Sequence, residues 1–322
     1  MKKFIIIFGA SFLAFALMIG GFSYYYLGKF KPQDSAFAQI VEENPELQPP
    51  SPKDDPILNI LIMGIDDARS DFMMVVRYNK ENNKAAFISV PRDTRVSIGN
   101  YGYNKINSAV ARKEGIPLAM DTVGDLLSIP IHHYVEMDFK GAEKIIDIMG
   151  GVKMKVDEPM NYTDPTQNLY IDIKAGEQVL NGKNAVNFVR YRSGYANGDL
   201  GRIRAQQDFA KALIKHMTSA KILPKAFSIL DTASKYVKTN MEQSEMVSYA
   251  LKLKDINPED IKMYTLPGDG AYIDKVSYFV YDEEELKLMN EEINNEIGLQ
   301  KSAGENIQDA ENHRNADIIG RK

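Results

Sequence analysis

The sequence predicts an α/β fold: a single α/β/α sandwich domain with a mixed central sheet, preceded by an N-terminal transmembrane helix. Short apolar runs rich in β formers alternate with segments of helical periodicity, and no internal repeat breaks the alternation. The uncharged run from Phe4 to Leu27 is long enough, as a helix, to cross a bilayer. A chain of 322 residues fits one main domain with accessory segments.

Two interpretations of the N-terminal run compete, a cleaved signal peptide and a retained anchor. A cleavage-like Ala36-Phe37-Ala38 lies well beyond the run, which is itself long for an h-region of about 7–15 residues. This favours a retained, single-pass anchor in the cell membrane. Lys2 and Lys3 favour a cytoplasmic N-terminus, so the domain that follows is expected outside the cell.

Four regions follow along the chain. Residues 1–31 are the cytoplasmic tip and anchor, and residues 32–56, with six prolines, are predicted to be an extracellular linker. Residues 57–299 form the domain, with its motifs between 57 and 220. Residues 300–322 are polar and predicted to be a disordered tail.

The first half of the domain opens with three strands. They are short apolar runs separated by turn-like stretches, at 57–64, 72–78 and 84–90. Helical periodicity in two pieces over 105–127, broken near Pro117, comes next, and then a strand at 131–138. In the helix predicted over 139–151, apolar side chains share one face and Gly150 ends the helix.

The second half starts with a strand at 152–156, where apolar and charged residues alternate. A short strand near 170–173 precedes a helix that begins near Asn181. The remaining elements are predicted from their periodicity: helices at 202–218, 223–236 and 243–254, strands at 261–266 and 271–281, and a helix from Asp282.

Composition excludes several classes of function. The chain has no cysteine, which excludes thiol nucleophiles, disulfides and cysteine-based zinc sites. GxxxxGK[ST], HExxH, GxSxG and a GxGxxG after a strand are all absent. Without residues 1–31 the chain keeps 35 basic and 44 acidic side chains, a net charge of −9. Nucleic acid is therefore not an expected partner, and any anion site must be local.

Arginine is concentrated in one part of the sequence. Nine of the eleven arginines lie between Arg69 and Arg204. The stretch VRYRSGYANGDLGRIR carries Arg190 and Arg192 at the end of one helix and Arg202 at the start of the next, where a helix N-terminus favours an anion. Guanidinium forks bind phosphate by two bonds, so the bias indicates an anion site. Arg204 is expected to pair with Asp208 instead.

Two further clusters follow predicted strands. GIDDARSD at 64–71 places Asp66, Asp67 and Asp71 within six residues, which suits Mg²⁺ as well as a solvated turn. VPRDTRV at 90–96 presents Arg92 and Asp93, which form either a binding site or a surface ion pair.

Three other features have a plain structural interpretation beside a functional one. Lys105, in YNKIN, either adds a compact charge to an anion site or is simply solvated. His132 and His133 face opposite sides of a strand and are expected to be structural. The apolar stretches 118–131 and 209–217 line either a lipid tunnel or the ordinary core.

The order of these motifs resembles the LytR-CpsA-Psr family of cell-wall assembly proteins. LNILIMGIDDARSD, ISVPRDTRV, YNKIN and VNFVRYR with GDLGRIRAQQ follow one another over about residues 57–220, behind an N-terminal anchor. The resemblance implies a catalytic domain that takes a glycopolymer, such as wall teichoic acid or capsule, from undecaprenyl pyrophosphate. It joins that polymer to a hydroxyl of peptidoglycan, expected to be the MurNAc C6 hydroxyl, and releases undecaprenyl phosphate.

Roles are implied by the same resemblance. Asp66 and Asp71 are the expected ligands of Mg²⁺ or Mn²⁺, and Asp71 or Asp93 is the expected base. The expected pyrophosphate clamp consists of Arg92, Lys105, Arg190, Arg192 and Arg202. Arg69 also falls on a motif position.

Two departures from the family pattern bear on the site. The loop between Asp66 and Asp71 is shorter than usual, and Ala205 stands where an arginine is usual. Three alternatives stay open at this point: a noncatalytic receptor or scaffold for lipid-linked glycans, a pyrophosphatase that admits water, and a transcriptional regulator. An acidic domain outside the membrane disfavours the last.

Overall fold

The computed structural model describes residues 35–66, 69–165, 169–191, 194–195, 199–217, 219, 221–253 and 260–299. Within these ranges, no helix has both the length and the apolar character needed to span a bilayer. The predicted anchor at 4–27 and the predicted tail at 300–322 lie outside the described residues, as does Arg192.

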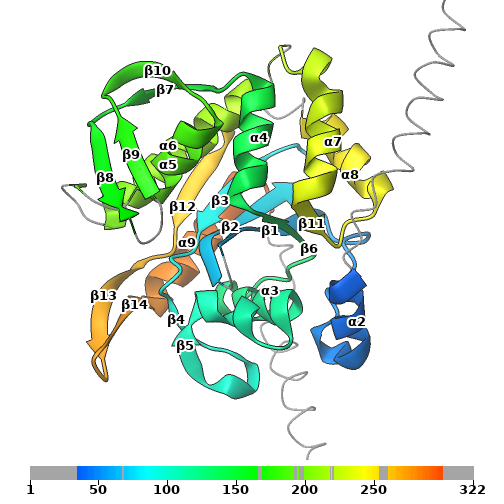
Figure 1. Ribbon diagram of the computed structural model, residues 1–322. Helices are drawn as coiled ribbons and strands as arrows, with labels where there is room; N and C mark the ends of the chain where they lie inside the picture. The colour runs from blue at the N-terminus through cyan, green and yellow to red at the C-terminus, as the bar shows by residue number, and fades with distance from the viewer. Residues whose placement is uncertain are drawn as a thin grey trace, which may run out of the picture.

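A six-stranded mixed sheet forms the centre of the domain, as Figure 1 shows, and the strand order is β11-β6-β1-β2-β3-β12. Its strands are β1 (Ile57–Asp66), β2 (Arg69–Asn79), β3 (Ala85–Ser89), β6 (His133–Met137), β11 (Val237–Thr239) and β12 (Lys262–Thr265). β1 pairs antiparallel with β2 and parallel with β6, and β3 pairs antiparallel with β2 and parallel with β12. The predicted α/β class with a mixed central sheet is therefore confirmed.

Strand direction decides which ends of the strands meet. Because β2 runs antiparallel to both of its neighbours, β1, β3, β6 and β12 all point the same way. Their carboxyl ends, together with the start of β2, lie along one side of the sheet, here called the C-terminal edge. Ligands of open α/β sheets bind at such an edge.

Helices cover both faces of the sheet in Figure 1. On one side lie α4 (Phe139–Met149) and α7 (Ala226–Tyr236), and on the other lie α2 (Ser35–Glu43) and α3 (Gly115–Leu127). The main core joins sheet residues such as Leu61 and Val75 to Val123 of α3 (Gly115–Leu127) and Ile293 of α9 (Glu283–Glu296). On the opposite face, residues of the sheet pack against α6 (Asp199–Met217) and α8 (Gln243–Leu253).

The segment expected to be a linker is partly folded. α2 (Ser35–Glu43) and the 3-10 turn η1 (Pro45–Leu47) lie within residues 32–56. Phe37 and Val41 of α2 are 8% exposed and belong to the main core, and the ring of Phe37 stacks on Tyr134 at 5.1 Å between centroids. The packed domain thus includes α2, because two apolar residues four apart give this short helix a buried side.

A second, smaller core lies beside the central sheet. It is built from four short strands and two helices: β7 (Val152–Val156), β8 (Met160–Asp164), β9 (Leu169–Ile173), β10 (Gly176–Leu180), α5 (Gly182–Arg190) and α6. β7 pairs with β10 and β8 with β9, both antiparallel. The alternating pattern predicted for 152–156 is present, since Val152, Met154 and Val156 are buried.

α4 (Phe139–Met149) connects the central sheet to this second core and also packs against α7 (Ala226–Tyr236). Its N-cap, Asp138, accepts a hydrogen bond from the backbone N–H of Gly141 at 2.6 Å. Its C-cap, Gly150, has a φ of 95°, as expected for the glycine that ends a helix. The sequence predicted both ends of this helix.

One prediction of secondary structure was wrong. Residues 271–281 form a hairpin of β13 (Gly268–Ile273) and β14 (Val276–Tyr281), because Asp274 and Lys275 adopt the left-handed φ values of a tight turn, 49° and 66°. The helical stretch predicted over 105–127 is present in two pieces, the 3-10 helix η3 (Ile106–Ala111) and α3. Before it the chain forms β4 (Arg95–Ser97) and β5 (Tyr103–Lys105), with the turn η2 (Gly99–Tyr101) between them.

Candidate active site

The predicted metal ligands lie where β1 turns into β2, at the C-terminal edge. Asp66 ends β1 and is paired with Arg69, the first residue of β2. The register shifts after Gly64, which is paired with Phe72 while Ile65 is paired with Ser70, so Asp71 lies in a β-bulge. Such a bulge bends the strand locally, and bulges are often found next to active sites.

The predicted metal site depends on carboxylate oxygens, which a hard divalent cation prefers as ligands. Asp66 and Asp71 are on paired strands, whose spacing is about 4.8 Å. The side chains of both acids and of Arg69 are outside the described residues. Among the side chains that the structure describes, no group of three or more His, Asp or Glu residues is arranged to hold a metal.

The loop after β3 carries Arg92 and Asp93 and is held at several points. The buried Thr94 donates its Oγ1 hydrogen to the carbonyl of Pro91 at 2.5 Å. The carbonyl of Arg92 accepts from the N–H of Asn107 at 3.2 Å, and the carbonyl of Asp93 accepts from the N–H of Phe279 at 2.9 Å. The loop is therefore fixed against η3 and β14, and both charged side chains start from a rigid backbone.

Three charged groups meet on this loop. Lys105 Nζ is 3.0 Å from Asp93 Oδ1, and Arg92 Nε is 3.7 Å from Asp93 Oδ2. The side chains of Arg92, Asp93 and Lys105 are 25%, 39% and 28% exposed, so solvent or a ligand can reach all three. The surface pair Arg92–Asp93 is thus present, but Lys105 is the nearer partner of Asp93.

Arg190, the last residue of α5, reaches the end of β1. Its guanidinium carbon lies 4.6 Å from the ring centroid of Phe139, a cation–π contact. Phe139 begins α4 and packs beside Gly64, where an added Cβ would lie 3.8 Å from its ring. Because Gly64 is two residues before Asp66, Arg190 and the two acids occupy neighbouring positions on the C-terminal edge.

One strand separates the cluster of Arg92, Asp93 and Lys105 from Arg190 and the end of β1. β2 lies between β1, where Arg190 reaches, and β3, which leads to Arg92. Two strand spacings amount to roughly 10 Å, a gap that two arginine side chains can bridge from opposite sides. The structure therefore brings the surroundings of Arg92, Asp93, Lys105 and Arg190 to one edge of the sheet.

The other predicted clamp residues are placed only in part. Arg202 lies in the first turn of α6, which starts at Asp199, and its side chain is outside the described residues. Arg192 lies outside them altogether.

Comparison with known proteins decides the family. The model of the LytR_cpsA_psr family matches residues 24–295, which is most of the chain. The chain belongs to the LytR-CpsA-Psr family. The sequence resemblance that predicted this family is confirmed.

Family relatives resemble the chain in sequence and in structure. The polyisoprenyl-teichoic acid–peptidoglycan teichoic acid transferase TagU of Enterococcus faecalis is 30% identical over 305 residues, covering 92% of this chain and 97% of the relative. The crystal structure of Bacillus subtilis TagV has a TM-score of 0.65 at 30% identity and covers 75% of this chain and 97% of that one. A structure of TagT bound to LI-WTA has a TM-score of 0.62 at 26% identity, with 76% of this chain and 92% of that one covered.

Two glutamines of this LytR-CpsA-Psr protein position α6 and were missed by the sequence reasoning. Gln206 Nε2 donates to the carbonyl of Val189 in α5 at 3.0 Å. Gln207 Nε2 donates to Thr265 Oγ1 at 3.0 Å, at the end of β12. Gln206 ties the helix that carries Arg202 to the helix that carries Arg190, and Gln207 ties it to the central sheet. The signal was available, because a consecutive pair of amides on a helix that packs against a sheet needs partners.

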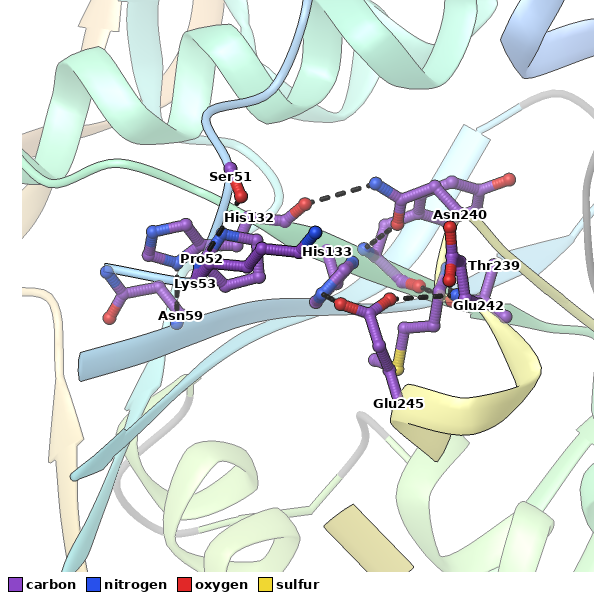
Figure 2. A network of polar contacts seen from close by, with 12 residues as sticks. Ser51, Pro52, Lys53, Asn59, His132, His133, Thr239, Asn240, Glu242 and Glu245 are labelled. Atoms are coloured by element: carbon purple, nitrogen blue, oxygen red, sulfur yellow. Dashed lines mark hydrogen bonds and ion pairs between the residues drawn. The ribbon is translucent and has the colours of Figure 1, made fainter. Parts of the chain in front are cut away.

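The histidines are structural, as the sequence predicts. Figure 2 shows His132 beside Asn59 and His133 beside Glu245. His132 Nδ1 accepts from the N–H of Asn59 at 3.0 Å, and His133 Nε2 is 3.6 Å from Glu245 Oε1. Burial lowers the pKa of both imidazoles. His133 also starts β6, about 13 Å from the C-terminal edge at 3.3 Å per residue, so neither histidine reaches the site.

The apolar stretches mostly serve the core. Leu118, Val123 and Leu127 belong to the main core and Phe209 to the second one, as the core alternative predicts. A separate cavity of about 260 Å³ lies beside the end of β1. Its apolar lining includes Phe37, Ile40, Ile65, Val110 and Ile116, with Glu136 and Lys238 also in its wall. Ile65, which lines this cavity, directly precedes Asp66 in the sequence.

Proposed function

We propose that this chain is a membrane-anchored phosphotransferase that moves a glycopolymer from undecaprenyl pyrophosphate to a hydroxyl of peptidoglycan. One observation carries the proposal: the Arg92–Asp93–Lys105 cluster and the guanidinium of Arg190 gather at the same sheet edge as the β1–β2 bulge. Relatives named as teichoic acid transferases, and TagT bound to LI-WTA, support it.

Charge neutralisation is the main task of such a site. A diphosphate concentrates negative charge on closely spaced oxygens, and a nucleophile approaches phosphorus only when that charge is balanced. Arg92, Lys105 and Arg190 supply three cations, from the loop after β3, from β5 and from α5. Arg192 and Arg202 are proposed to complete the clamp. The same cations stabilise polyprenyl phosphate as it leaves.

The reaction balances without a covalent enzyme intermediate. The acceptor hydroxyl, proposed to be C6 of MurNAc, attacks the phosphorus that carries the sugar, and the bond from that phosphorus to the oxygen of polyprenyl phosphate breaks. Asp71 or Asp93 takes the hydroxyl proton. The rigid loop that carries Asp93, which is fixed by backbone hydrogen bonds, supports Asp93 as one of the two candidates.

Asp66 and Asp71 are the proposed ligands of Mg²⁺ or Mn²⁺. A cation held there would add positive charge for the diphosphate to bind. The β-bulge at Asp71 and the pairing of Asp66 with Arg69 support this assignment.

The polyprenyl chain needs an apolar path. We assign this path to the cavity beside Ile65, because the lining of the cavity is mainly apolar and the cavity adjoins the end of β1. Residues 4–27 are proposed to anchor the chain in the cell membrane, in which the lipid carrier is also embedded. The N-terminus is then in the cytoplasm.

The test uses the full chain in detergent micelles with a synthetic polyprenyl pyrophosphate–linked disaccharide and soluble peptidoglycan strands. Polyprenyl phosphate should be released and the disaccharide joined to the strands only with Mg²⁺ or Mn²⁺. Arg92→Ala should abolish both. Release with equal rate in excess chelator would overturn the metal assignment. Release without any joining would indicate a pyrophosphatase, and binding without release a scaffold.

A further inference from the structure

A second cavity, here called the tyrosine cavity, lies in the smaller core next to the proposed clamp. It has a volume of about 260 Å³ and opens between β7–β8 and the α5–α6 connection. Buried apolar side chains line its base: Met154, Met160, Phe188 and Tyr191. It is separate from the apolar cavity beside Ile65, with which it shares no lining residue.

Two tyrosines give the cavity an aromatic wall. The rings of Tyr191 and Tyr195 meet edge to face, with centroids 5.3 Å apart and an angle of 71° between their planes. Two glycines make room for them. A Cβ on Gly201 would lie 2.7 Å from Tyr195 Cβ, and a Cβ on Gly194, whose φ is 83°, would lie 2.7 Å from Tyr191 Oη. The backbone is thus shaped to hold both rings in place.

Charged side chains surround the opening. Asp157, Glu158 and Asp208 contribute carboxylates, and Lys155 and Arg204 contribute cations. Burial raises the pKa of Asp208, and the charges of Lys211 and Arg204 oppose this. Arg204 and Asp208, which the sequence expected to be a structural pair, therefore both face the cavity.

This lining suits a sugar. The apolar face of a pyranose ring packs on an aromatic ring, and carboxylates accept hydrogen bonds from sugar hydroxyls. A polyphosphate chain suits it less, because acids outnumber bases at the opening by three to two. The chemistry thus favours a neutral, hydroxyl-rich glycan over an anionic polymer.

The position of the cavity is next to the clamp. Tyr191 directly follows Arg190, whose guanidinium stacks on Phe139. On α6, Gly201 and Arg204 flank the proposed clamp residue Arg202 in sequence. The hydrogen bond from Gln206 to Val189 fixes the two helices together. A sugar in the cavity would therefore have its neighbours along a glycan strand close to the diphosphate.

We propose that the tyrosine cavity binds one sugar unit of the neutral glycan strand that accepts the polymer. This assignment rests on the proposed function and names the site of its second substrate. The cavity then holds the strand in register, so that a hydroxyl of an adjacent sugar meets the phosphorus at the clamp.

Binding and kinetics test the proposal separately. The probe for binding is the soluble tetramer of N-acetylglucosamine, measured by saturation-transfer NMR on the full chain in detergent micelles. Tyr195→Ala and Asp208→Asn should each weaken tetramer binding by roughly tenfold. In the transfer assay they should raise the KM for peptidoglycan strands by a similar factor, while the KM for the lipid-linked donor stays unchanged.

Tyr272→Ala is the matched control, because Tyr272 lies on the β13–β14 hairpin with 82% of its surface exposed. It should behave as the unaltered protein in both assays. Thermal unfolding of each variant checks the fold, and Asp208→Asn covers the case in which Tyr195→Ala is unstable.

The outcomes separate the two proposals. Tetramer binding by Tyr195→Ala and Asp208→Asn equal to that of Tyr272→Ala would overturn the cavity assignment. Weaker binding of poly(glycerol phosphate) with unchanged tetramer binding would also overturn it, since the cavity would then hold the donor polymer. Tyrosine-dependent tetramer binding in a protein that shows no transfer with any donor would support a sugar site while refuting the proposed function.

Discussion

Replacing Lys105 by methionine separates a role in folding from a role in binding the diphosphate. Lys105 Nζ lies 3.0 Å from Asp93 Oδ1, and the two side chains are 28% and 39% exposed. Solvent screens a pair of this exposure, so its loss should cost at most about 1 kcal/mol of unfolding free energy. For a domain of this size that corresponds to a decrease in Tm of about 2–4 °C.

The effect on catalysis should be much larger. A hydrogen bond from an ammonium group to a phosphate oxygen contributes about 1.5–3 kcal/mol. Its loss should lower kcat/KM for the lipid-linked donor by roughly 10- to 150-fold. The assay is release of polyprenyl phosphate by the full chain in micelles, with Tm measured on the same preparation. Lys105→Arg should recover part of the activity, because it keeps the positive charge.

Lys287→Met is the matched control. Lys287 Nζ makes a similar ion pair with Glu284 Oε1 at 2.9 Å, but within α9 and without a contact to the Arg92–Asp93–Lys105 cluster. It should leave kcat/KM unchanged. Lys105 has no role in binding the diphosphate if Lys105→Met has the kcat/KM of this control, or if its Tm falls by so much that unfolding explains the loss.

Two more predictions follow from contacts around the sheet. Phe139→Leu should lower kcat/KM for the donor by about fivefold, because the cation–π contact between the Phe139 ring and Arg190 contributes about 1 kcal/mol. A kcat/KM equal to that of the unaltered chain would show that the ring does not position Arg190. Acidification from pH 7.5 to 5.5 should lower Tm, because burial lowers the pKa of His132 and His133 and the unfolded chain therefore binds more protons below about pH 6.5. Thermal denaturation by circular dichroism measures this, His133→Phe should weaken the dependence, and a Tm that rises on acidification would contradict it.

The central sheet was predictable because its strands carry their own signal. The runs at 57–64, 72–78 and 84–90 are apolar and β-branched, and each became a strand of the sheet. The hairpin at 268–281 was missed for a local reason. Its turn is Asp274-Lys275, which lacks the glycine or asparagine that usually marks left-handed residues, so the flanking strands looked continuous.

The sequence predicts contacts in the site only between residues that are close together along the chain. Arg92, Asp93 and Lys105 fall within one short stretch, and their meeting follows from β3 and β5 being close in sequence. The contact between Arg190 and Phe139 joins residues about fifty positions apart, and nothing in either local pattern announces it. The position of Ala205 could not be predicted from the local sequence either. Its small side chain lines the tyrosine cavity, which the packing of α6 against β7 creates.

The packing of α2 sets how far the domain can stand from the membrane. If residues 4–27 are embedded, only the seven residues 28–34 connect the lipid surface to Ser35, because Phe37 and Val41 hold the next turn in the core. Fully extended, that tether spans at most roughly 25 Å. A stalk of the whole segment 28–56 would be about four times longer. With an anchor at residues 4–27, the domain would therefore stay close to the membrane, and only the part of the wall nearest to the lipid surface would be within its reach.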